Sequence, residues 1–149
     1  MLSAVILSCG CRQPSSSSRA SDPMASAIAP TAAELSGFSQ HSGIQLPSSA
    51  QPVRFYGESG LDSAMWLQFR LPSAQFQQFI TSSPIPPAEV RRDAPGGGSA
   101  LYYFRTWLPV APKDFQYADT QIAPGRCVKC IFDFDDPQTT VIYLMWFTT

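Results

Sequence analysis

Two cysteines with a CxxC spacing, Cys127 and Cys130 in GRCVKC, are the first residues whose types and spacing could do chemistry. A redox dithiol places its first cysteine at the N-terminus of a helix, and a zinc site needs about four ligands. The motif instead enters a strand-like stretch, IFDFDD, and the domain has no second cysteine pair. We therefore interpret the two residues as a local disulfide in an exported protein, or as reduced core residues in a cytoplasmic one. A disulfide would require a bend, which Gly125 permits, because these positions face opposite sides of a regular strand.

The acidic stretch DFDDPQ, from Asp133 to Gln138, offers three carboxylates that could hold a cation. It lacks the glycine and the distal glutamate of an EF-hand calcium loop. Asp-Pro in a hairpin turn accounts for Asp135 and Asp136. We predict no metal site here.

Residues for catalysis are few. His41 is the only histidine, and we expect it to lie in a flexible N-terminal region, where it could not join a serine or cysteine nucleophile. Glu58 and Asp62 could do acid–base work, but they lie in a turn beside Gly60, where solubility explains them equally well. The PGGG stretch at 95–98 lacks the lysine of a phosphate-binding loop. The sequence predicts no catalytic residue, no cofactor and no enzyme.

A candidate interaction surface lies around the Pro/Gly-rich loop 81–100. Arg91, Arg92, Arg105 and Trp107 have the residue types that interfaces favour, although most of the aromatic side chains are expected in the core. The partner would be an unknown protein or small molecule. Nucleic acid is excluded as a partner because the net charge is -1 and no basic stripe occurs.

The sequence predicts that a small antiparallel sheet positions these residues. VRFY and AMWLQFRLP form one expected hairpin, CVKCIFDF and TTVIYLMWFTT another, and FQYADTQIA a further strand. Phe76, Phe79 and Ile80 lie on one face of a short helix that Ser73 would cap. The last strand is apolar on both faces and is therefore expected in the centre of the sheet. We predict an α+β fold with an antiparallel sheet of about four to six strands and one main helix on one face; the alternative is a small all-β barrel.

The chain divides into three parts. Residues 1–11 form a truncated, signal-like end, residues 12–43 a disordered tether rich in Ser, Ala and Pro, and residues 44–149 one folded domain. No apolar run approaches the roughly 20 residues that cross a bilayer.

The first part resembles the lipobox of bacterial lipoproteins in the residues Ile6, Leu7, Ser8 and Cys9. The resemblance implies a signal peptide cleaved before Cys9, a lipid on its thiol, and an anchor in a membrane. Gly10, which is not aspartate, implies sorting to the outer membrane of a Gram-negative cell, facing the periplasm. No Lys or Arg precedes Cys9, so we expect either that the signal begins upstream of Met1 or that the match arose by chance.

The domain itself resembles small uncharacterised Gram-negative lipoproteins in GIQLPSSA, WLQFRLP and VIYLMW, over residues 43–149. The resemblance implies a location and a fold but no activity. The expected function is a membrane-tethered, non-enzymatic binding or interaction module of the cell envelope. The alternative is a soluble, cytoplasmic partner-binding module of the immunity or inhibitor type.

Overall fold

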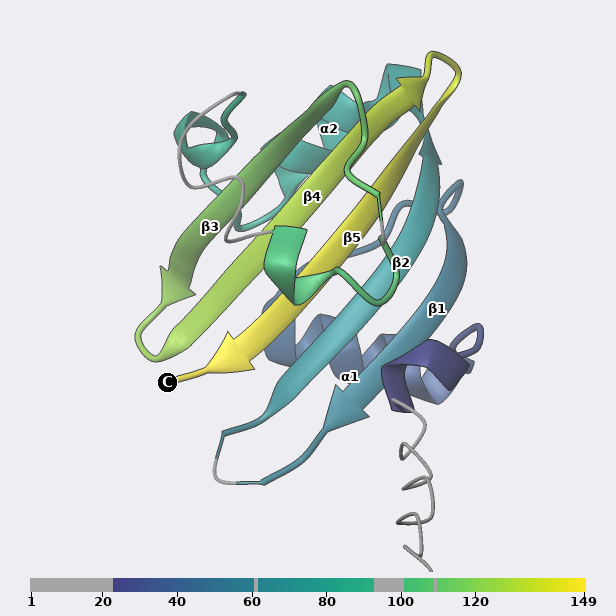
Figure 1. Ribbon diagram of the computed structural model, residues 1–149. Helices are drawn as coiled ribbons and strands as arrows, with labels where there is room; N and C mark the ends of the chain where they lie inside the picture. The colour runs from purple at the N-terminus through teal and green to yellow at the C-terminus, as the bar shows by residue number, and fades with distance from the viewer. Residues whose placement is uncertain (1–22, 61, 93–100, 109) are drawn as a thin grey trace, which may run out of the picture.

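The computed structural model describes residues 23–60, 62–92, 101–108 and 110–149 (Figure 1). Its strands are β1 (Gln51–Glu58), β2 (Ala64–Pro72), β3 (Phe115–Ala123), β4 (Arg126–Asp136) and β5 (Thr139–Thr148). Its α-helices are α1 (Ala32–Ser42) and α2 (Phe76–Ser82), and its 3-10 turns are η1 (Pro23–Ser26), η2 (Ser73–Gln75) and η3 (Pro87–Glu89). Residues 101–107 form a further helical turn.

The strands form one open antiparallel sheet in the order β1-β2-β5-β4-β3 (Figure 1). The predicted antiparallel sheet of four to six strands is therefore confirmed, and so are both predicted hairpins and the strand FQYADTQIA. β5, the last strand in the chain, lies between β2 and β4 as predicted. Gly125, with φ of 66°, lies in the tight turn between β3 and β4.

Both faces of the sheet are covered, which explains why β5 is apolar throughout. Ile142, Leu144 and Trp146 of β5 belong to a buried cluster beneath the helices. Tyr143 and Met145, which alternate with them, belong to a second cluster on the opposite face. Burial of alternate residues on the two faces stabilises the central strand from both sides.

Two helices, rather than the predicted single main helix, pack on the first face. α2 buries Phe76, Phe79 and Ile80, the three residues whose spacing predicted it. Ser73 does not cap this helix: its hydroxyl lies 3.1 Å from that of Thr140. The longer helix is α1, which packs into the same cluster through Phe38.

The tether predicted over 12–43 extends too far, because residues 32–42 form α1. Thr31 and Glu34 make a reciprocal capping box at its start, and Gly43, with φ of 72°, ends it. Phe38 is 0% exposed. One buried phenyl ring and two good caps offset the small, polar composition that suggested disorder. Residues 12–22 lie outside the described residues, as does the signal-like end 1–11.

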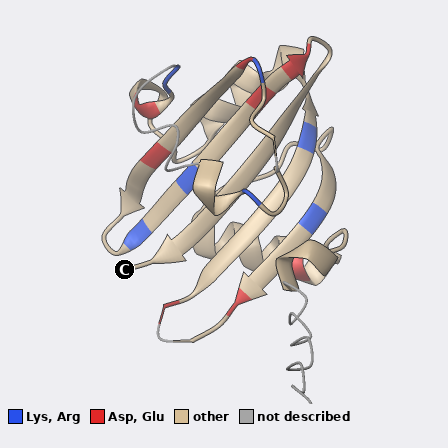
Figure 2. Cartoon of the chain, in the orientation of Figure 1, with Lys and Arg blue, Asp and Glu red and all other residues tan. Residues whose placement is uncertain are grey.

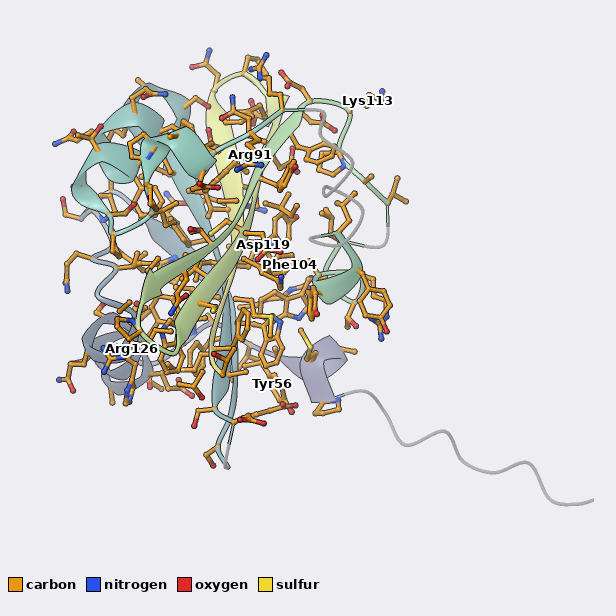
Figure 3. The ribbon with its side chains drawn as sticks, turned by 90° about the vertical axis from the view of Figure 1, so that its left-hand side faces the viewer. Tyr56, Arg91, Phe104, Lys113, Asp119 and Arg126 are labelled. Atoms are coloured by element: carbon orange, nitrogen blue, oxygen red, sulfur yellow. The ribbon has the colours of Figure 1, made fainter. Side chains whose placement is uncertain are left out.

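On the opposite face, η1 and the segment 101–108 cover the sheet (Figure 3). Phe104, fully buried, points from this segment onto the sheet and lies 6.1 Å from Tyr143 between ring centroids. Trp107 donates a hydrogen bond from Nε1 to the carbonyl oxygen of Met24, at 2.7 Å. The two covering segments are thus joined to each other as well as to the sheet.

Each edge strand meets one residue from outside the sheet. Ile28 forms a bridge to Phe55 of β1, and Arg91 forms a bridge to Tyr117 of β3. Both bridges are antiparallel and occupy backbone groups that an edge strand leaves unpaired.

Within the described ranges, the helices all fall short of the length and apolar character that crossing a bilayer demands.

Candidate functional site

A pocket of about 400 Å³ lies beside the C-terminal turn of α1, lined by residues from the end of β1 and β5 and from the start of β2 and β4. Phe55, Met65 and Trp146 supply apolar walls, and Glu58 and Arg126 line the pocket as well. Its volume falls within the range of small-molecule sites, which combine an apolar lining with a few polar groups.

The C-terminal turn of α1 brings His41 to this pocket. Its imidazole lies 5.6 Å from the ring of Trp146 between centroids, and the two planes are tilted by 35°. The turn is held in place because Ser42 Oγ donates to the carbonyl oxygen of Phe38 at 2.7 Å and accepts from the N–H of Ile44. His41 therefore belongs to the folded domain, which corrects its expected place in a flexible region.

Gly57 helps to keep the pocket open. It pairs with Met65, which in turn pairs with Trp146, so the three lie in one row across β1, β2 and β5. A Cβ at Gly57 would be 3.5 Å from the ring of Phe55 and 3.8 Å from Met65, which is ordinary van der Waals contact. Gly57 is not in the left-handed region, so its role is to leave space rather than to permit a turn.

The rim on the β4 and β5 side is rich in hydrogen-bond donors. Arg126 pairs with Thr148 across the two strands, and Thr148 Oγ1 accepts from the N–H of Ser63 at 3.1 Å. Thr148 can therefore still donate its hydroxyl proton. The guanidinium of Arg126 has no ion pair within the described ranges.

Trp146 lies beneath this rim. The residue is 3% exposed, and its Nε1 is buried without a hydrogen-bond partner among the described residues. Glu58 Oε1 accepts from the Tyr56 hydroxyl at 3.0 Å. Tyr56 packs in the second cluster, so the Glu58 carboxylate lies toward the face of the sheet opposite the pocket.

The two carboxylates that sequence suggested for acid–base work do not share the site. Glu58 lines the pocket, whereas Asp62 is exposed and does not line it. Ser59 and Ser63 also line the pocket, but His41 makes no hydrogen bond to either of them in the part of the chain that the structure describes.

The DFDDPQ stretch forms the predicted hairpin turn between β4 and β5. Asp133 Oδ1 accepts from the N–H of Asp135 at 2.9 Å, and Asp136 Oδ1 accepts from the N–H of Gln138 at 2.9 Å. Burial raises the pKa of Asp133 above its ordinary value; the hydrogen bond from Asp135 N–H lowers it, and the charge of Asp135 raises it further. These carboxylates organise the turn through its backbone.

Burial also raises the pKa of Tyr143, and the negative charge of Asp133 adds to the rise. Arg54 and Arg70 act in the opposite direction. These groups lie on the face of the sheet opposite the pocket, where Figure 2 shows charged residues that are sparse and dispersed rather than gathered by sign.

Cys127 and Cys130 are both free, so the candidate disulfide is not formed. β4 is regular here: Cys127 pairs with Phe147, and Cys130 pairs with Leu144 on the opposite face. The bend that a disulfide required is absent between them. Burial raises the pKa of Cys130 well above its ordinary value, and the charge of Asp119 adds to the effect. Cys9, the candidate lipid site, lies outside the described residues.

The residues of the candidate interaction surface lie in separate places in the structure. Arg91 and Arg92 are exposed, with Arg91 paired to Glu89 at 2.7 Å. Arg105 is exposed on the segment 101–108, with its guanidinium 4.0 Å from the centroid of the Tyr102 ring. Trp107 is only 5% exposed, so its place on a surface was wrong. A sheet that is apolar on both faces needs an aromatic cover on each, and Trp107 contributes to the second cover.

A buried lysine was also missed. Lys129 of β4 is 9% exposed, forms an ion pair with Asp119 of β3, and lies 4.9 Å from the centroid of the Tyr103 ring. The opposite charge and the aromatic ring compensate for its removal from water. Its partners account for it fully as a structural residue.

Comparison of the chain with protein-family models, with curated proteins and with solved structures gave no match.

Sequence reasoning missed the pocket, although two signals for it were present. Thr31 and Glu34 have the T-x-x-E spacing of a capping box, which predicts that a helix starts here and that His41 belongs to it. A glycine inside a strand pattern, as Gly57 is, often marks a close approach to the backbone.

Proposed function

We propose that this domain is a non-enzymatic binding module and that the pocket between His41, Gly57 and Trp146 is its small-molecule site. The observation that carries the proposal is the missing side chain at Gly57, which leaves space beside Phe55 and Met65 under a His41–Trp146 ring contact. A few polar residues line an otherwise apolar space, as in ligand sites generally. Because His41 makes no hydrogen bond to Ser59 or Ser63 within the described ranges, no activated nucleophile is invoked.

The pocket is tested with N-phenyl-1-naphthylamine, an uncharged dye whose fluorescence rises in apolar sites. We expect one dye per chain. Gly57→Val should weaken binding by about tenfold or more, a loss of about 1.4 kcal/mol. The fold should survive, because valine is favoured in strands and the new Cβ meets only ordinary contacts.

Gly37→Ala is the matched control for this variant. Gly37 lies in α1 with open space around it and does not line the pocket. Equal dye binding by wild type and Gly57→Val would contradict the proposed site.

We further propose that the module is tethered at the periplasmic side of the outer membrane through a lipid on Cys9. The support is the lipobox-like run Ile6 to Cys9, followed by Gly10. Two or more acyl chains anchor a domain firmly, since each buried CH₂ contributes about 0.8 kcal/mol.

Radiolabelled palmitate, supplied to a Gram-negative cell that expresses the gene with its own upstream sequence, tests the tether. Cys9→Ala should abolish the label and release the protein from the membrane fraction. Cys11→Ala is the matched control and should retain both. A Cys9→Ala protein that fractionates as the wild type does would contradict the anchor.

The second candidate is the soluble partner-binding module, and an exposed aromatic group favours it. Tyr102 is 60% exposed, packs edge-to-face on Tyr103 at 5.8 Å, and carries Arg105 on its ring. Tyr and Arg are enriched at protein interfaces. Fractionation of the wild-type chain with the cytoplasm would favour this candidate over the tethered one.

For the fold, we propose the α+β class, since α1 and α2 both pack on one face of the sheet. The predominance of strand makes an all-β classification the alternative.

A further inference from the structure

We infer that the pocket takes a small apolar carboxylate, with its anionic head at Arg126 and its apolar body toward Gly57. The inference rests on the proposed function and goes further by naming the ligand class. It depends on how donors, acceptors and apolar walls are distributed around the pocket.

Arg126 and Thr148 lie on the β4 and β5 side of the pocket, whereas Ser59 and Ser63 line it from the turn between β1 and β2. Arg126 and Thr148 face each other across these strands, and Trp146 lies two residues before Thr148 on the same face of β5. Figure 3 places Arg126 at the lower end of the sheet, near α1. The guanidinium of Arg126 has no ion pair in the described part of the chain, so it is available to an acceptor.

A carboxylate suits these donors better than a neutral acceptor does. The guanidinium presents planar, paired N–H groups that match the two oxygens of a carboxylate, and such charge-assisted bonds are about twice as strong as neutral ones.

The apolar walls lie on the other side of the pocket. Phe55 and Gly57 belong to β1, and Met65 belongs to β2. Three strand spacings of about 4.8 Å separate β1 from β4, so the pocket spans about 14 Å of sheet. A ring joined to a carboxylate through a short alkyl chain suits this span better than a bare ring acid.

Arg126 fixes the direction in which the ligand lies. Its guanidinium attracts a carboxylate to the β4 side of the pocket, which leaves the apolar body of the ligand toward Phe55, Gly57 and Met65 on β1 and β2. A cationic ligand would be repelled by Arg126.

The test compares three probes of one shape: 4-phenylbutyrate, the uncharged 4-phenylbutyramide and the cationic 4-phenylbutylamine. Each is titrated against the full chain, with displacement of N-phenyl-1-naphthylamine and the indole N–H signal of Trp146 as readouts. We expect phenylbutyrate to bind about tenfold more tightly than the amide, and the amine to bind most weakly.

Arg126→Gln should remove the preference for the carboxylate while leaving binding of the amide unchanged. Lys113→Gln removes the same charge from an exposed residue that does not line the pocket, so the preference should persist.

The outcomes separate this inference from the proposed function. If all three probes displace the dye equally, or if the amine binds most tightly, the pocket stands and the carboxylate class is wrong. A carboxylate preference that survives in Arg126→Gln also overturns the inference. If neither the dye nor any probe binds, the proposed function fails as well.

Discussion

The indole N–H of Trp107 donates to the carbonyl oxygen of Met24, a residue 83 positions earlier in the chain. This bond joins the segment 101–108 to η1, and both cover the face of the sheet opposite the pocket. Pro23–Ser26 therefore lies on the face of the sheet opposite the pocket, which His41 of α1 lines.

Trp107→Phe should loosen residues 23–28 without unfolding the sheet. The variant loses one hydrogen bond to a buried carbonyl, worth about 1 kcal/mol, and amide exchange of Ala25–Ile28 should accelerate. Trp66→Phe is the matched control, because Trp66 belongs to the same cluster and its Nε1 has no partner among the described residues. Equal acceleration in both variants would mean that the hydrogen bond does not hold the segment.

Two glycines of α1 should respond to alanine in opposite directions. Gly37 lies in the helix interior with open space around it, so Gly37→Ala should stabilise the domain by about 0.5–1 kcal/mol. Gly43 ends the helix in the left-handed region, so Gly43→Ala should destabilise it by about 1–2 kcal/mol. Thermal unfolding measures both; shifts of the same sign would contradict the structure of this helix.

The capping box of α1 should make stability depend on pH in the acid range. Hydrogen bonds from the backbone N–H and then the hydroxyl of Thr31 lower the pKa of Glu34 below its ordinary value. Because the pKa of Glu34 is lowered in the folded state, its ionised carboxylate stabilises the fold fully above the ordinary pKa of glutamate. This stabilisation is lost as the pH falls through the lowered pKa.

Thr31→Ala removes one of these donors and the cap, at a cost of about 1 kcal/mol at neutral pH. The carboxyl ¹³C signal of Glu34 should then titrate closer to the ordinary value. An unchanged titration curve in this variant would show that the box does not form.

Ionisation of Asp133 should change the stability of the fold with the opposite sign to that of Glu34. Burial raises its pKa, so the folded state holds this proton more tightly than the unfolded state does. The contribution is present below the ordinary pKa of aspartate and is lost as pH rises through the raised one.

Asp133→Asn keeps an oxygen to accept from the Asp135 N–H but cannot ionise. This variant should match or exceed the wild type in unfolding free energy at pH 7 and lose its advantage at low pH. It should also lower the pKa of Tyr143, which the charge of Asp133 raises. The Tyr143 ring ¹³C titration measures this, and a rise instead of a fall would contradict the arrangement.

The sheet could be predicted because a local sequence pattern identifies each strand. Alternation in AMWLQFRLP, the two-sided apolar run VIYLMW and the Asp-Pro turn each identify an element without reference to the rest of the chain. α2 followed from Phe76, Phe79 and Ile80 in the same way.

α1 was missed because its signal is not apolar. It buries Phe38 and Ser42, and its boundaries are set by Thr31, Glu34 and Gly43 rather than by a hydrophobic face. The small, polar composition of residues 12–43 favoured a disordered tether, although the capping residues indicate a helix.

The pocket could not be predicted because it depends on strand order. His41, Gly57, Arg126 and Trp146 come from four elements far apart in the chain, and they meet only because β5 inserts between β2 and β4. Pairing register determines which residues share a row, and no local pattern specifies it across non-adjacent strands.

The two bridges at the sheet edges carry a consequence for behaviour at high concentration. Ile28 on β1 and Arg91 on β3 each occupy a position where the strand of another molecule could otherwise add. A chain shortened past Ile28 would keep most of its core but lose the bridge that protects the edge of β1. Such a chain should self-associate through β1, which light scattering would detect before any loss of secondary structure.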